Sequence, residues 1–203
     1  MTRVAIIDNG GGNVASVRFA LDRLGAESIV TQDAEAIGAA SHVILPGVGA
    51  APEGMRRLAQ AGLDALIPRL RQPVLGICLG MQLLCEGSEE GPTRCLGVFQ
   101  GTANRLEAAR DRAVPHMGWN QVVACRSSPL LAGLEPGDYG YFVHSFAVPV
   151  GADTVATTDY GRTFAAAVSR GNFHGVQWHP ERSAGTGARL LANFLALGTS
   201  PWN

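Results

Sequence analysis

The segment GICLG at 76–80 places Cys78 between two glycines. The apolar run at 74–77 predicts a strand buried on both faces, and residues 81–85 favour helix. A sharp strand-to-helix turn of the form G-x-C-x-G is the thiol counterpart of the G-x-S-x-G nucleophile elbow. The open N–H groups of the first helical turn would favour a thiolate there. The pattern therefore predicts a nucleophilic cysteine, and the alternative is a buried structural cysteine.

A base and an orienting carboxylate stand near the end of the chain, in His179-Pro180-Glu181. Proline disfavours helix at the preceding residue, so we expect His179 to be extended at a strand end. Residues two apart on an extended chain point to the same side, which lets Glu181 reach the imidazole. With Cys78, these residues predict a catalytic triad in the order Cys, His, Glu. Alone, H-P-E is equally compatible with an ordinary loop.

A third segment, PGVG at 46–49, follows a predicted strand. Glycines there let backbone N–H groups approach a ligand closely, although a plain turn has the same composition. One N–H of this loop and the N–H after the nucleophile could form an oxyanion hole. The predicted oxyanion residues are Gly47, Val48, Gly49 and Leu79.

Other histidines and one tryptophan have competing interpretations. His144 also ends a predicted strand, but no carboxylate stands two residues on to orient it, so we interpret it as a hydrogen-bonded residue near the pocket. Trp119 could be a core anchor or a contact for a partner protein. We interpret the remaining histidines as surface or hydrogen-bonded residues: His42, His116 and His174.

The composition of the chain excludes several classes of function. The 203 residues carry a net charge of −1, so nothing steers the chain to nucleic acid or to an anionic membrane. No apolar run is long enough for a membrane span and no signal peptide is recognisable. The 4 cysteines form no C-x-x-C pair, so we expect no metal site and free thiols in a reducing cytoplasm. The absence of lysine excludes Schiff-base chemistry, a Ser–Lys dyad and a Walker A loop.

Strands and helices alternate through the first half. Apolar runs at 4–7, 28–31, 43–45 and 74–77 predict strands, and helical spacing occurs at 14–24 and 55–70, with Asn13 as an N-cap. After a loop at 87–97, short alternating runs without helices predict antiparallel hairpins. A strand at 173–178 and a helix at 190–197 close the chain. We expect an α/β fold: a flavodoxin-like parallel sheet with helices on both faces and added antiparallel hairpins in the C-terminal half.

Three motifs resemble those of class I glutamine amidotransferases: LPGVG at 45–49, GICLGMQ at 76–82 and HPE at 179–181. The resemblance covers nearly the whole chain, which implies one such domain over residues 1–203. Further segments resemble the glutaminase subunits of imidazole glycerol phosphate synthases, from histidine biosynthesis. These segments are residues 9–13, PHMGWN at 115–120, YFVHSF at 141–146 and QWHPERS at 177–183.

The resemblance implies that Cys78 forms a γ-glutamyl thioester, that His179 transfers the proton and that Glu181 orients it. It implies L-glutamine as substrate and no cofactor. Ammonia would pass to a (β/α)₈-barrel synthase partner, which makes imidazole glycerol phosphate and an aminoimidazole carboxamide ribotide. The residues that would hold glutamine are Gly49, Gln82, Glu90 and the backbone of Ser145 and Phe146.

The chain departs from the family pattern at two positions. The family often has an aromatic residue where Ala51 stands, and a lysine where Arg182 follows HPE. Neither position belongs to the triad, and both would lie near the subunit interface. An arginine does not reproduce the geometry of a lysine, so the details of that interface would differ.

Two other functions remain possible from the sequence. One is an oxidoreductase, because Gly10-x-Gly12-x-x-Ala15 with Asp33 further on fits a dinucleotide-binding fingerprint. The other is a non-enzymatic or stress-response relative of the same fold that keeps a reactive Cys78. Within the amidotransferases, the glutaminase subunit of another synthase is the alternative.

Overall fold

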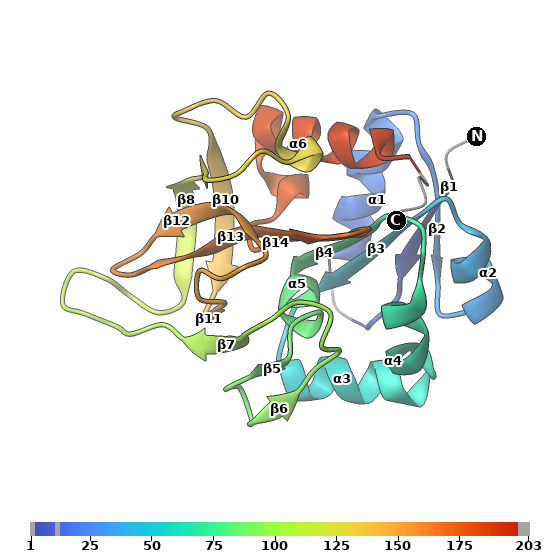
Figure 1. The fold of residues 1–203 in the computed structure, drawn as a ribbon, viewed down its shortest axis with the longest axis horizontal. Helices are drawn as coiled ribbons and strands as arrows, with labels where there is room; N and C mark the ends of the chain where they lie inside the picture. Colours follow the sequence, from blue (N-terminus) through green and yellow to red (C-terminus); the bar gives the residue numbers. More distant parts are fainter. Residues whose placement is uncertain (1–2, 11–12, 199–203) are drawn as a thin grey trace.

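The computed structural model describes residues 3–10 and 13–198, and its centre is an eight-stranded sheet (Figure 1). Five neighbouring strands are parallel: β2 (Glu27–Thr31), β1 (Arg3–Ile7), β3 (His42–Gly47), β4 (Val74–Cys78) and β14 (Phe173–Val176). Their order, 2-1-3-4-5 when counted along the chain, is the flavodoxin-like order. The predicted fold class is confirmed.

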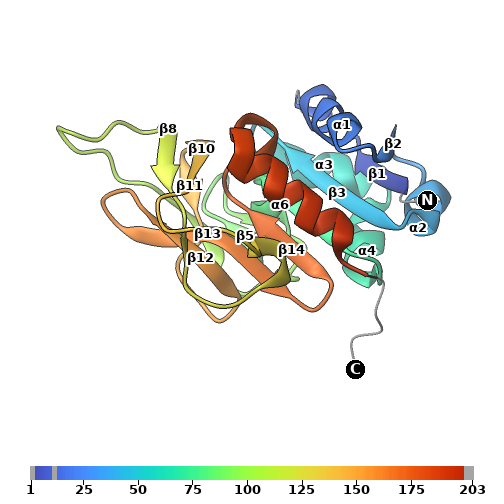
Figure 2. The ribbon, with the colours of Figure 1, turned by 90° about the horizontal axis from the view of Figure 1, so that it is seen from above.

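Helices cover both faces of the parallel half. The helices α1 (Val14–Arg23) and α6 (Ala184–Ala196) pack on one face, as seen from above in Figure 2. The opposite face is covered by α2 (Ala34–Ala39), α3 (Ala51–Gln60), α4 (Leu63–Leu66) and α5 (Leu79–Leu83). Alternate residues of β1 enter the two cores, Val4 and Ile6 on one side and Ala5 and Ile7 on the other.

Antiparallel strands extend this sheet and form two smaller ones. The strand β13 (Thr163–Arg170) pairs with β14 and continues to β12 (Thr154–Asp159) and β9 (Val123–Ala124). The strands β8 (His116–Gln121) and β10 (Tyr139–His144) form a two-stranded antiparallel sheet. The last sheet contains β11 (Phe146–Ala147), β7 (Thr102–Arg105), β5 (Gly87–Ser88) and β6 (Thr93–Arg94). The 3-10 turns are η1 (Ile67–Arg69), η2 (Pro129–Leu131) and η3 (Pro180–Arg182).

Several local predictions need correction. The expected loop at 87–97 contains β5 and β6, because β5 pairs both with β6 beside it and with β7 further along the chain. The helical region at 55–70 is interrupted at Gly62, whose φ of 67° no helix residue adopts, and continues as α4 and η1. The last parallel strand ends at Val176 rather than at residue 178. None of the helices in the described residues is long and apolar enough to cross a membrane.

The turn between β4 and α5 is the most constrained part of the fold. Cys78 ends β4 with a φ of 54°, and α5 begins at the next residue. The helix lies directly against the backbone of the neighbouring strand, because a Cβ atom at Gly80 would overlap the carbonyl oxygen of Leu45. A Cβ at Gly76 would lie 2.7 Å from the backbone nitrogen of Met81. Both glycines flanking Cys78 are therefore required by close backbone packing.

Gly80→Ala should lower the free energy of unfolding by about 3 kcal/mol, since the new methyl group must displace backbone atoms rather than a flexible side chain. The measurement is a urea unfolding curve. Gly38→Ala in α2 is the matched control, because no atom lies within 4 Å of a Cβ there and the change should stabilise the helix by ~0.5–1 kcal/mol. Equal effects of the two substitutions would contradict this description of the turn.

Candidate active site

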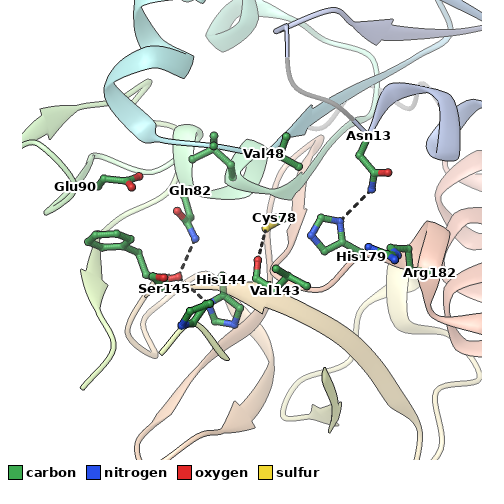
Figure 3. Close-up of a pocket in the computed structure, with 14 residues that line it drawn as sticks. Asn13, Val48, Cys78, Gln82, Glu90, Val143, His144, Ser145, His179 and Arg182 are labelled. Atoms are coloured by element: carbon green, nitrogen blue, oxygen red, sulfur yellow. Dashed lines mark hydrogen bonds between the residues drawn. The ribbon is translucent and has the colours of Figure 1, made fainter. Parts of the chain in front are cut away.

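A pocket of about 440 Å³ opens at the carboxyl ends of β3 and β4 (Figure 3). Open α/β sheets bind their ligands at such strand ends. Nine of the predicted site residues line it: Val48, Gly49, Cys78, Leu79, Gln82, Glu90, Ser145, Phe146 and His179. The other two adjoin it, because Glu181 contacts His179 and Gly47 pairs with Cys78 in the sheet. The structure thus brings together residues from both halves of the chain.

His179 lies between the nucleophile candidate and a buried carboxylate. Its Nδ1 is 2.8 Å from Oε1 of Glu181, whose side chain is fully buried. Its ring faces Cys78 across the pocket in Figure 3. Burial by itself lowers the pKa of this imidazole, but interactions with Cys78 and Glu181 outweigh it and raise the pKa well above 6.5. The arrangement favours the imidazolium form of His179.

The backbone around His179 is held by Ser183. The Ser183 hydroxyl donates to the carbonyl of His179 at 2.7 Å and accepts from the N–H of Tyr141 at 2.9 Å. The N–H of His179 donates to the carbonyl of Tyr141, also at 2.9 Å. These bonds fasten the segment after β14 to β10, so the imidazole has a fixed position relative to the pocket.

Asn13 is a site residue that the sequence reasoning missed. It occupies the N-cap position of α1 as predicted, but its side chain makes no capping hydrogen bond. Instead Nδ2 donates to Oε1 of Glu181 and lies 3.4 Å from Nδ1 of His179. Nothing in the local pattern distinguishes this role from capping, since Asn13 and Glu181 are 168 positions apart.

The PGVG loop passes Cys78 at close range. Gly47 stands opposite Cys78 in the parallel ladder, and a Cβ there would lie 2.9 Å from Cβ of Leu79. Gly49 has a φ of 92°, with nothing within 4 Å of the position of a Cβ. Val48 is 41% exposed. The loop thus begins tightly packed against α5 and becomes uncrowded two residues later.

Glu90 and Gln82 enter the pocket from the side opposite His179 (Figure 3). Oε2 of Glu90 accepts from the N–H of Ala51 at 2.8 Å, which caps the N-terminus of α3 just after the PGVG loop. The buried Gln82 uses its amide nitrogen twice, donating to the carbonyl of Phe146 at 2.8 Å and to Oε1 of Gln177 at 3.0 Å. The Gln82 oxygen is thereby left as the end that can accept from a ligand.

His144 lines the pocket but is not available as a base. Its Nδ1 must donate to the carbonyl of Phe146 at 2.8 Å, so its Nε2 accepts from Nδ1 of His116 at 3.1 Å. Burial lowers the pKa of His144 to about 3 and that of His116 to about 4. Both rings are neutral hydrogen-bonded residues at neutral pH, in agreement with their sequence interpretation.

The other cysteines differ from Cys78 in their surroundings. Burial raises the pKa of Cys85 far above the usual range and that of Cys95 to about 11. Cys125 is exposed and lies away from the pocket. Among residues 3–10 and 13–198, no group of three His, Cys, Asp or Glu side chains is arranged to hold a metal ion.

The dinucleotide fingerprint gains no support from the residues that the structure describes. Gly12 lies outside them. Asp33, which would bind a ribose, is the N-cap of α2 and accepts from the N–H of Ala36 at 2.7 Å. A Cβ at Gly10 would overlap the guanidinium of Arg57, so this side chain covers the turn that would receive a phosphate.

The sequence of this chain is similar to those of known proteins. The family model for class I glutamine amidotransferases matches residues 5–197. The chain belongs to this family. It is 55% identical over 197 residues to the imidazole glycerol phosphate synthase subunit HisH of Xanthomonas campestris, covering 97% of this chain and 98% of that protein. The HisH subunit of Xylella fastidiosa is 54% identical over the same shares of the two chains.

Solved structures agree with the fold of this amidotransferase. One, a glutamine amidotransferase, has a TM-score of 0.75 at 20% identity over 95% of this chain and 97% of that chain. The PurLQS structure from Thermotoga maritima has a TM-score of 0.73 at 19% identity, over 96% of this chain and 97% of that chain. At such low identity these structures show the fold alone.

Proposed function

We propose that this amidotransferase is the glutaminase component of an imidazole glycerol phosphate synthase and acts in the cytoplasm. The observation that carries the proposal is the 55% identity to HisH over 97% of the chain. The pocket supports it, since Cys78 and His179 line it and Glu181 lies within hydrogen-bond distance of His179. In the proposed reaction, glutamine and water give glutamate and ammonia.

Glutamine would lie between the two sides of the pocket. The free oxygen of Gln82 and the unoccupied oxygen of Glu90 are acceptors for its amino group. The backbone of Gly49, Ser145 and Phe146 would contact its other polar groups. This placement directs the side-chain amide of the substrate towards Cys78.

In the first half-reaction, the Cys78 thiolate attacks the carbon of that amide. The new oxyanion would accept hydrogen bonds from the N–H of Leu79 and from one N–H of the loop at 47–49. The His179 imidazolium gives its proton to the leaving nitrogen, the C–N bond breaks and ammonia departs. The product is a γ-glutamyl thioester, and Glu181 keeps the imidazole oriented throughout.

In the second half-reaction, His179 takes a proton from water, and the resulting hydroxide attacks the thioester carbon. The tetrahedral intermediate collapses as the C–S bond breaks, which releases glutamate and restores the Cys78 thiolate beside a protonated His179. The two half-reactions use the same base and the same oxyanion donors.

A partner would receive the ammonia next to the pocket. The β8–β10 sheet exposes Met117, Trp119 and Tyr139. Trp119 is 54% exposed on β8 and is therefore no core anchor. The guanidinium of Arg182 lies over the ring of Tyr141 in the same sheet, 5.1 Å from the ring centre, and Arg182 lines the pocket. We propose this apolar surface as the contact for a (β/α)₈-barrel synthase.

His179→Ala should reduce the glutaminase kcat more than Glu181→Gln, because the first change removes the base and the second only its orienting partner. Cys78→Ala should abolish glutamate formation. Activity is measured with the synthase partner and its nucleotide ligand present. Cys85→Ala is the matched control and should retain activity, since Cys85 is a buried thiol whose sulfur faces the carbonyl of Met81 rather than the pocket. Full activity of folded Cys78→Ala would refute the nucleophile assignment.

Glutamine hydrolysis by the isolated chain should be slow and should accelerate by a factor of ~10²–10³ when the synthase and its nucleotide ligand bind. The reason is the loop at 47–49, where the open surroundings of Gly49 let a peptide rotate its N–H towards or away from the oxyanion. An oxyanion donor acts on the transition state, so the change should appear in kcat and much less in KM.

Steady-state kinetics with and without the partner decide this point. Full-speed hydrolysis by the lone chain, or an effect confined to KM, would contradict a gated oxyanion loop and leave the triad untouched. The same assay is repeated with synthases that accept ammonia in other pathways. It tests the alternative that this chain is the glutaminase subunit of one of those synthases. Only the imidazole glycerol phosphate synthase partner should accelerate the reaction.

A further inference from the structure

One fully buried amide, that of Gln177, takes no part in the steps above. Gln177 follows β14 directly and stands two residues before His179. Its Oε1 lies 3.0 Å from the amide nitrogen of Gln82, and its Nε2 lies 3.6 Å from the sulfur of Cys78. A hydrogen-bonded chain therefore runs from the substrate side of the pocket to the nucleophile.

A backbone carbonyl determines which end of each side-chain amide donates in this series of hydrogen bonds. The carbonyl oxygen of Phe146 can only accept, so the Gln82 group that lies 2.8 Å from it must be the NH₂ group. The same NH₂ group faces Gln177, which must therefore present its oxygen to Gln82. The remaining end of the Gln177 amide is the NH₂ group, and it faces Cys78. The orientation follows from the network as a whole.

The sulfur of Cys78 has a second polar neighbour, which is a hydrogen-bond acceptor and not a donor. The carbonyl oxygen of Val143 lies 3.7 Å from it and accepts the S–H of the neutral thiol. Once the proton leaves, this oxygen opposes the negative sulfur, whereas an N–H group bonds an anion more strongly than a neutral acceptor. The Gln177 amide thus favours the form of Cys78 that the Val143 carbonyl disfavours.

We propose that Gln177 is a catalytic residue, whose side-chain amide donates a hydrogen bond to the Cys78 sulfur and stabilises its thiolate. Given the function proposed above, the bond acts twice. It supports the thiolate that attacks glutamine. It also stabilises the developing charge when the C–S bond of the thioester intermediate breaks and the electron pair returns to sulfur.

The test compares two Gln→Met substitutions. Gln177→Met keeps the length of the side chain and removes the donor. Gln72→Met is the matched control, because Gln72 donates one amide bond to the carbonyl of Ile37 at 2.9 Å, outside the pocket. Iodoacetamide alkylation is followed over a range of pH, by mass spectrometry of the peptide that contains Cys78. Peptide resolution matters because the exposed Cys125 also reacts.

The pH of half-maximal alkylation at Cys78 should rise by about one unit in Gln177→Met and stay unchanged in Gln72→Met. The titratable groups around the sulfur, His179, Glu181 and His144, are the same in both variants. With the partner present, kcat should fall about tenfold in Gln177→Met, with KM changed less than twofold. Should Gln177→Met fail to fold, Gln177→Glu keeps the shape, lacks the donor when ionised and should raise the alkylation midpoint further.

An unchanged alkylation midpoint in the folded Gln177 variant would overturn the proposal, and so would an equal shift in Gln72→Met. These outcomes do not depend on glutamine hydrolysis. Wild-type protein that hydrolyses no glutamine with its partner would refute the proposed function, while the alkylation curves would still decide the role of Gln177.

Discussion

The backbone of Cys78 adopts a positive φ of 54°, a conformation that costs a residue with a side chain ~1–3 kcal/mol. The surrounding structure holds it there. The strand β4 is paired on both sides, by β3 and by β14, and α5 lies so close to β3 that Gly80 admits no side chain. Among the described residues, the only other non-glycine positive φ is at Ala184, five residues after His179. Of these two positions, only Cys78 lines the pocket.

The position of the pocket residues follows from this turn. It places Leu79, the first residue of α5, at the pocket, and Gln82 on the same helix reaches the carbonyl of Phe146. His144 donates to that carbonyl as well, so one acceptor holds the side chains of both Gln82 and His144. All 5 histidines are buried, but burial lowers the pKa of four of them and only that of His179 is raised. Charge can therefore develop at one imidazole, the one that faces Cys78.

The sequence predicts the elements whose signal is local. Runs such as residues 4–7 and 74–77 are apolar because both faces of a central strand are buried, and the elbow glycines mark the turn beside them. Elements with a weak local signal were not anticipated: α2 buries only Ile37, and β5 depends on a partner 15 residues away. Asn13 and Gln177 make contacts with residues that lie far away in the sequence, so local patterns alone do not indicate their roles. Period-two spacing before His179 was the one signal that could have indicated Gln177.

We propose that this strained turn presents Cys78 as the nucleophile for glutamine. The most direct measurement is covalent labelling by a glutamine-analogue diazoketone, with the synthase partner and its nucleotide bound, followed by mass spectrometry of all four cysteine-containing sites. We expect one label per chain, on Cys78, and we expect excess glutamine to block it. Labelling of Cys125 instead, or labelling of Cys78 that glutamine does not block, would contradict it.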